Sequence, residues 1–150
     1  MVHEVLDRLS VPSFCKTSGA TGLHVYVPCA KKYTYDQVKD FALLICMAVH
    51  EQLPRFTSLE RNLKVRGKKI YLDHLQNRRG QTIAAAYSLR PHPGATVSTP
   101  LHWKEVKKGM SPADFNIVSV PARLQKTGDI FPGILGKGFD LLKVLEKMEK

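Results

Sequence analysis

The sequence predicts one α/β (α+β) domain, in which helices flank a mixed or antiparallel sheet of short strands. Three observations support this fold class. The 150 residues are 43% apolar, which is enough to bury a core. Apolar residues follow helical spacing near both ends and in residues 34–54. Short apolar stretches between turn residues supply the strands, and no internal repeat suggests a domain boundary, so we expect one domain over residues 1–150.

A short helix is expected to open the chain and to stop near Pro12. Apolar residues recur there at i, i+3, i+4 and i+7, namely Val2, Val5, Leu6 and Leu9. Residues 13–17 (SFCKT) and 23–28 (LHVYVP) are typical of two strands, and residues 18–22 form the Gly-containing loop between them. The sequence therefore predicts a strand, loop, strand unit.

Residues 34–54 carry the clearest helix pattern. Thr34 and Gln37 stand at capping-box spacing, and Pro54 ends the pattern. One face is apolar, with Val38, Phe41, Ile45, Ala48 and Val49.

The middle of the chain reads as further short strands. Residues 63–75 are typical of two strand pieces around a turn at Gly67, and residues 81–89 of another strand. Residues 91–100 are rich in Pro, Gly, Ser and Thr, which favours an ordered loop.

Two more helices are expected near the C-terminus. Ser111, Pro112 and Asp114 provide a cap, a first-turn proline and an acid at the positive end of a short helix. An amphipathic helix follows Gly138.

The chain is strongly basic, with 23 Lys and Arg against 13 Asp and Glu. Residues 51–108 alone hold 12 basic and 4 acidic residues, so the excess is regional. A polyanion such as nucleic acid, a nucleotide or membrane headgroups is therefore a natural partner.

The cysteines and the apolar runs indicate a cytoplasmic protein that does not span a membrane, and among the polyanions we expect nucleic acid and nucleotide and no membrane partner. Cys15, Cys29 and Cys46 show no CxxC spacing, which favours reduced, packed thiols. The first residues lack the apolar run of a signal peptide, and the longest run, residues 41–49, is too short to span a bilayer.

The loop at residues 18–22 is a candidate phosphate site. Its backbone N–H groups can form an anion nest, and Lys16, Ser18, Thr21 and His24 can add donors. It is not a Walker loop, because no GKS or GKT follows and the loop opens a strand. The alternative is an ordinary turn with a histidine of no ligand role.

Residues 68–90 form a second candidate site. Ile70–Leu72 would deliver Asp73 into a basic neighbourhood that ends at Arg90, which suits a metal and phosphate site. Alternatively, Asp73 is a turn or cap residue and the arginines are a solvated face.

Three stretches together resemble a known family: "KTSGATGLHVYVP", "YLDHLQNRRGQTIAAAYSLRP" and "VSTPLHWKEV". They are similar to the polymerase domain of the bacterial ligase D proteins, members of the archaeo-eukaryotic primase superfamily that act in nonhomologous end joining. The resemblance runs from about Ser13 to Phe131 in the family's order. It implies an RRM-like primase-polymerase core and nucleotidyl transfer with Mn or Mg, leaning toward manganese and ribonucleotides. It also implies DNA, a nucleoside triphosphate, Ku and a ligase domain or chain as partners.

The resemblance also implies roles for single residues. Ser18 and His24 would contact the triphosphate, and Arg90 would grip it. Asp73 matches the third catalytic carboxylate, and is therefore the expected catalytic residue and metal ligand. Gln76 and Asn77 match a short element beside the site. With Lys16 from the strand before the loop, the expected nucleotide-binding residues are Lys16, Ser18, His24, Gln76, Asn77 and Arg90.

Two features depart from the family pattern. The family places its other metal ligands in an Asp-x-Asp pair upstream of this loop, where this sequence has only Glu4 and Asp7. We therefore expect the chain to match the C-terminal portion of the domain and to be incomplete. Thr21 stands where many relatives have Lys, which removes one cation from the loop.

Three hypotheses follow. The chain is a polymerase module whose metal pair comes from a missing segment or a complementing chain, an inactive nucleotide-binding or DNA-binding module, or a basic accessory protein that only holds DNA. A partial sheet would leave an exposed edge, so we expect pairing with a partner or with a second copy as a homo-oligomer.

Overall fold

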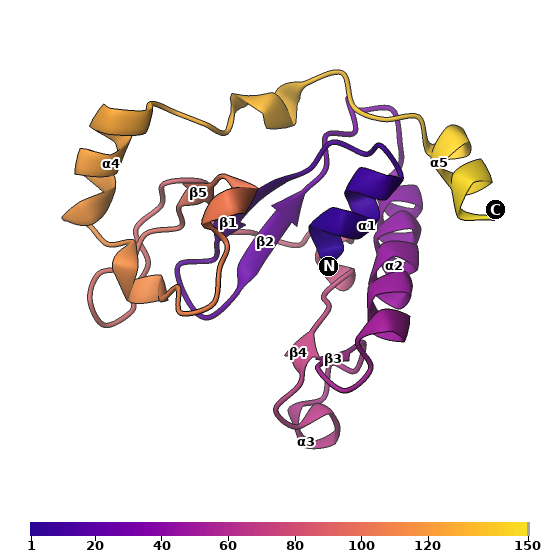
Figure 1. The fold of residues 1–150 in the computed structure, drawn as a ribbon, viewed down its shortest axis with the longest axis horizontal. Coiled ribbons are helices and arrows are strands. Elements are labelled where there is room, and N and C mark those ends of the chain that lie inside the picture. The colour runs from indigo at the N-terminus through magenta and orange to yellow at the C-terminus, as the bar shows by residue number, and fades with distance from the viewer. Residues whose placement is uncertain (150) are drawn as a thin grey trace. The chain divides into compact units, whose positions relative to one another are not determined.

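The structure is a computed structural model that describes residues 1–149, and the chain divides into two compact units. The first unit comprises Met1–Val11, Lys31–Ile83 and the segment that starts at Leu141. The second comprises Pro12–Ala30 and Ala84–Asp140 (Figure 1). The architecture is mixed α and β, with a small antiparallel sheet and flanking helices, as the sequence predicts.

Helices dominate the first unit: α1 (Val2–Arg8), α2 (Tyr35–Gln52) and α5 (Leu141–Met148). The predicted capping box of α2 is present, because the Thr34 hydroxyl accepts from the Gln37 N–H at 3.3 Å and the Gln37 side chain accepts from the Thr34 N–H at 2.9 Å. α1 packs on α2 (Figure 1). The buried apolar side chains of this unit are Val5, Leu6, Val11, Phe41, Ile45, Val49 and Val144.

A short parallel pair completes the first unit. β3 (Thr57–Ser58) pairs with β4 (Ile70–Tyr71), and the 3-10 helix η1 (Leu75–Asn77) follows. Residues 63–66, which the sequence analysis assigned to a strand, form helix α3 (Leu63–Arg66) instead. The Asn62 side chain accepts from the Lys64 N–H at 3.0 Å and so caps α3, whereas the predicted strand at Ile70 is confirmed.

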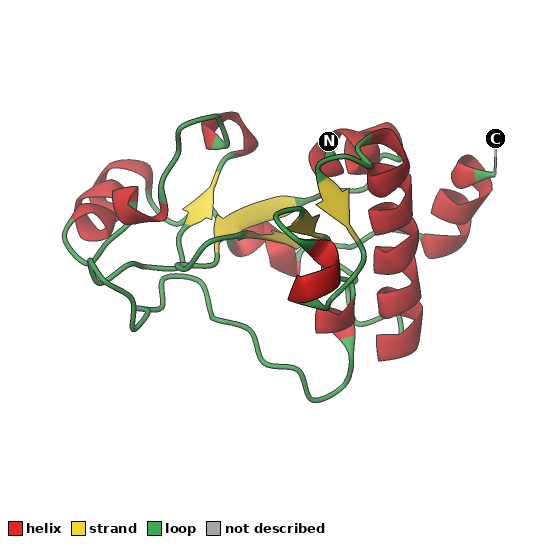
Figure 2. Cartoon of the chain, turned by 90° about the horizontal axis from the view of Figure 1, so that it is seen from below, coloured by secondary structure: helices red, strands yellow, loops and turns green. Residues whose placement is uncertain are grey.

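A three-stranded antiparallel sheet lies in the second unit. It holds β1 (Phe14–Thr17), β2 (Leu23–Tyr26) and β5 (Pro100–Leu101), in the order β2-β1-β5. β1 and β2 confirm the predicted strand, loop, strand unit, and their register places Lys16 opposite His24. Loops make up much of this unit outside the sheet (Figure 2).

Short helices follow β5: the 3-10 helices η2 (Trp103–Glu105), η3 (Pro112–Asp114) and η4 (Pro132–Leu135), and α4 (Ser119–Thr127). The predicted helix at Pro112 is confirmed, and the Ser111 hydroxyl caps it. The buried apolar side chains of the unit are Cys15, Val97, Leu101, Val120, Phe131 and Phe139.

The strand predicted for residues 81–89 is wrong. Only an isolated bridge between Leu89 and Val97 forms there. Tyr87 adopts a φ of +63°, which an extended strand does not tolerate. In the part of the chain that the structure describes, no helix is both long and apolar enough to cross a membrane.

Candidate nucleotide-binding site

The loop between β1 and β2 is organised by the Ser18 side chain. Its Oγ accepts the backbone N–H groups of Ala20 at 3.0 Å and Gly22 at 3.1 Å, and the Ser18 N–H donates to the Gly22 carbonyl at 2.8 Å. The N–H groups of Ala20 and Gly22 are therefore hydrogen-bonded to Ser18. They do not form the open anion nest that the sequence predicts. A hydroxyl that accepts two bonds still has its own hydrogen to donate, so Ser18 can offer one donor to a ligand oxygen.

The loop packs against the Arg90 side chain at Gly19. Gly19 is buried with a φ of +71°, and a Cβ there would overlap the Cγ of Arg90 and lie 3.1 Å from the Ser98 nitrogen. The Thr96 hydroxyl donates to the Gly19 carbonyl, and the main-chain N–H of Arg90 donates to the Thr96 carbonyl at 2.8 Å. The stem of Arg90 is thus held against the loop by main-chain geometry.

The Arg90 head carries a donor that the described residues leave unused. Its Nε is buried and has no hydrogen-bond partner among them. A buried guanidinium N–H without an acceptor is costly in a folded protein. An anion placed beside it would remove that cost, because the guanidinium fork fits phosphate oxygens.

Lys16 lies fully buried beside this cluster. Its Nζ donates to the Ser98 Oγ, lies 3.0 Å from the Nδ1 of His24, and lies 5.8 Å from the centre of the Tyr26 ring. Burial, and secondly the nearby charge of Arg90, lower the pKa of Lys16 to about 8. Two cationic side chains are therefore close together, and neither forms an ion pair with a carboxylate of the described residues.

Asp73 lies in the first unit, two residues after β4. It is exposed, and its Oδ1 accepts the Leu75 N–H at 3.0 Å, so the carboxylate closes a turn at the start of η1. Burial, and secondly the Asp73 charge, raise the pKa of the neighbouring Cys46 thiol to about 11. Within residues 1–149 no group of three His, Cys, Asp or Glu side chains gathers around a point, and the role of Asp73 as a metal ligand stays a prediction.

Gln76 and Asn77 also lie in the first unit, on η1. The Gln76 Nε2 donates to the Thr82 carbonyl at 2.5 Å, and the Asn77 Nδ2 donates to the His74 carbonyl at 3.2 Å. Both side-chain amides therefore hold their own loop. Their contact with a nucleotide stays a prediction.

The structure thus brings Lys16, Ser18, His24 and Arg90 into the second unit and places Asp73, Gln76 and Asn77 in the first. Sequence reasoning missed three residues that hold this cluster together: Gly19, Thr96 and Ser98. The signal for Thr96 and Ser98 was present in the "TVSTP" stretch, residues 96–100, whose hydroxyls bond the loop and Lys16.

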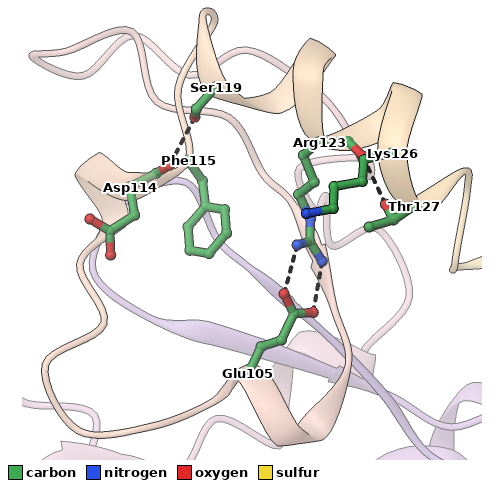
Figure 3. Close-up of a pocket in the computed structure, with 7 residues that line it drawn as sticks. All are labelled: Glu105, Asp114, Phe115, Ser119, Arg123, Lys126 and Thr127. Carbon is green, nitrogen blue, oxygen red and sulfur yellow. Dashed lines mark hydrogen bonds and ion pairs between the residues drawn. The ribbon is translucent and has the colours of Figure 1, made fainter.

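A separate hollow of about 450 Å³ lies in the second unit (Figure 3). In it, Arg123 from α4 makes two parallel hydrogen bonds to Glu105, at 2.6 and 2.7 Å, and a third at 3.3 Å to the Pro100 carbonyl of β5. These bonds from Arg123 hold the pKa of Glu105 below its usual value. None of the predicted site residues lines this hollow, whose main interaction ties α4 to η2.

Residues 1–131 match the family described as LigD, primase-polymerase domain. The chain belongs to this family. The family resemblance expected from the three sequence stretches is thereby confirmed.

Individual LigD proteins are similar over most of the chain. The bifunctional non-homologous end joining protein LigD of Bacillus subtilis is 37% identical over 128 residues, which are 85% of this chain and 21% of that protein. The multifunctional non-homologous end joining protein LigD of Pseudomonas aeruginosa is 36% identical over 122 residues, 81% of this chain and 14% of that protein. The chain thus spans about a fifth or less of the length of these relatives.

A solved structure supports the same fold assignment. The polymerase domain from Mycobacterium tuberculosis ligase D in complex with DNA superimposes with a TM-score of 0.81 and 25% sequence identity. The match covers 92% of this chain and 48% of that chain. The LigD family is therefore supported by sequence and by fold.

Proposed function

We propose that this chain is a DNA-repair nucleotidyltransferase module of the primase-polymerase type, which binds a nucleoside triphosphate and DNA ends in nonhomologous end joining. Ser18, His24 and Arg90 contact the triphosphate, with Lys16 behind them. Asp73 is the catalytic carboxylate that this chain contributes. Gln76 and Asn77 border the nucleotide.

One observation carries the proposal: Arg90 is held against a glycine loop with a buried, unused Nε donor, next to the ammonium of Lys16. Two like charges are costly to place together without a counterion. A triphosphate supplies the missing negative charge and several acceptor oxygens. The leaving pyrophosphate develops negative charge in nucleotidyl transfer, and nearby cationic donors stabilise such charge.

Asp73 fits the role of one ligand to a divalent ion, Mn or Mg, because it is exposed and only one of its oxygens accepts the Leu75 N–H. When bound, such ions stabilise the attacking and leaving oxygens of phosphoryl transfer. The described residues provide no further cluster of ligands. Other ligands, such as the triphosphate oxygens or carboxylates from a complementing segment or chain, must complete the site.

The basic surface of the first unit suits DNA as the second substrate. Helix α3 and its flanks carry Arg61, Lys64, Arg66, Lys68 and Lys69. Phosphate contacts from such residues give affinity without sequence preference. Ku, a ligase domain or chain, and a second copy of this chain are the further partners that we propose from the family.

Primer extension tests the proposal. The substrate is a gapped, 5′-phosphorylated duplex with nucleoside triphosphates and manganese, and wild type is compared with Asp73→Asn. The Asn side chain can still accept the Leu75 N–H, so this variant keeps the turn at the start of η1 and removes only the charge. We expect extension by the wild type, alone or with a complementing LigD segment, and none by the variant.

Binding of ATP in the presence of manganese separates the alternatives. Loss of binding in His24→Ala and Arg90→Met supports the nucleotide site even where extension fails, and then favours an inactive binding module. DNA binding that weakens steeply with salt, with no ATP binding by the wild type, would overturn the proposal in favour of an accessory protein.

A further inference from the structure

The Lys16 side chain is too deeply buried to contact a ligand directly. It is fully buried, and His24, Ser98 and Tyr26, which its ammonium contacts, all belong to the second unit. Two of its three ammonium hydrogens have acceptors: the Ser98 Oγ and the Nδ1 of His24. The Tyr26 ring, 5.8 Å away at its centre, faces the same ammonium.

The direction of these hydrogen bonds is fixed by Ser98. Its Oγ donates its single hydrogen to the Thr17 carbonyl at 2.7 Å. Ser98 can therefore only accept from Lys16. Because an ammonium has no lone pair, Lys16 must likewise donate to His24, and the Nδ1 of His24 must be the nitrogen that carries no hydrogen.

We propose that Lys16 is a positioning residue that holds His24 in the neutral tautomer with its hydrogen on Nε2. In that form His24 presents an N–H donor to a phosphate oxygen without adding a third positive charge to the cluster. A hydrogen on Nδ1 would oppose the Lys16 ammonium across 3.0 Å. The role of Lys16 is then to orient the ring and fix its tautomer, and its contact with the triphosphate is indirect.

The donor form of Lys16 is available near neutral pH. With a pKa of about 8, Lys16 is mostly an ammonium at about pH 7. The backbone supports the same geometry, because Lys16 and His24 are directly opposed in the β1-β2 register. Side chains of opposed residues lie on the same face of a sheet, so the contact follows from the strand pairing.

The primary test is the tautomer of His24, read from its two ring nitrogen signals by NMR in the protein without nucleotide. The wild type should show a protonated Nε2 and a bare Nδ1. A protonated Nδ1 in the wild type would overturn the proposal, whatever any variant does.

Lys16→Met keeps the stem and removes the donor, and Lys107→Met removes one exposed charge from the same unit as a matched control. In Lys16→Met we expect the His24 nitrogen signals to average between tautomers. Two tautomers and two ring orientations give His24 four states, of which one presents the Nε2 hydrogen to the ligand. The fraction of protein in that state therefore falls to about a quarter, and ATP binding weakens about fourfold. Lys107→Met should leave both the nitrogen pattern and the binding as in wild type.

This inference rests on the proposed nucleotide site, but the two fail differently. A wild type that does not bind ATP removes the nucleotide site and leaves the tautomer measurement valid. A folded Lys16→Met protein with wild-type nitrogen signals and wild-type ATP binding would overturn the positioning role while the nucleotide site stands.

Discussion

Gly19 and Arg90 are in direct contact, so closely that a single methyl group on Gly19 would occupy the place of the Arg90 Cγ. Gly19 also has a left-handed φ of +71°. The residue that shapes the loop and the residue that would bind phosphate therefore depend on each other.

Gly19→Ala tests this dependence. The positive φ and the overlap with Arg90 should lower the free energy of unfolding by about 1 to 3 kcal/mol, measured by urea denaturation. ATP binding should fall as well, because the Arg90 stem has to move. Gly22→Ala is the matched control from the same loop, since a Cβ at Gly22 meets nothing within 4 Å. Equal effects of the two substitutions would refute the role of the contact.

Arg90→Met should weaken ATP binding by about 1.5 to 3 kcal/mol, the range for a hydrogen bond to a charged group. This corresponds to a dissociation constant about 10- to 150-fold higher, measured by titration calorimetry. Arg55→Met, an exposed arginine of the first unit, controls for the loss of one charge. An unchanged dissociation constant in Arg90→Met would remove this residue from the site.

Asp73→Ala and Asp73→Asn should separate metal binding from the hydrogen bond that Asp73 accepts at the start of η1. Both variants should lose Mn-dependent binding, because both lose the charge. Only Asp73→Ala loses the acceptor for the Leu75 N–H, which should cost about 1 kcal/mol of stability. Paramagnetic broadening by Mn near Leu75 measures the first effect, and thermal unfolding measures the second. Broadening that persists in both variants would argue against Asp73 as a ligand.

Lys16 should titrate with a midpoint near 8, about two to three units below an ordinary lysine. Because the folded state holds this proton less tightly than the unfolded state, its contribution to stability rises as pH increases from about 8 to 10.5. The carbon signal next to Nζ reports the titration directly. A bound triphosphate should raise the midpoint, since a nearby negative charge favours the ammonium. A midpoint that ATP at saturation does not move would place the anion elsewhere.

Glu105→Gln should destabilise the second unit at neutral pH by about 1 to 2 kcal/mol, because the charged pair with Arg123 is largely shielded and doubly hydrogen-bonded. The folded-state pKa of Glu105 is depressed, so the charge contributes above the unfolded value of 4.5. The difference between wild type and variant should therefore shrink as pH falls below that value. Urea midpoints across acidic pH measure this. A constant difference would show that the charge contributes nothing.

Local sequence signals determined the elements that were predicted correctly. The capping box at Thr34 and Gln37, the alternation at residues 23–26 and the Ser111 cap all act over a few residues, and each appears where expected. The three family stretches likewise identified the LigD family, because they preserve a set of residues in a fixed order.

Other features depended on contacts that local patterns do not encode. Residues 63–66 became a helix because Asn62 caps it, and residues 81–89 failed to form a strand because Tyr87 turns out of the extended region. The parallel pairing of β3 with β4 joins segments that no alternation signal connects.

The sequence by itself determined the family, the main helices and the residue types of the site. Only the tertiary structure decided how those residues are used: Lys16 buried against His24 and Ser98, Arg90 locked on Gly19, and Ser18 holding its own loop. The physical reason is that exposure and hydrogen-bond direction depend on partners up to 82 residues away in the chain, which become neighbours only when β1, β2 and residues 96–98 fold together.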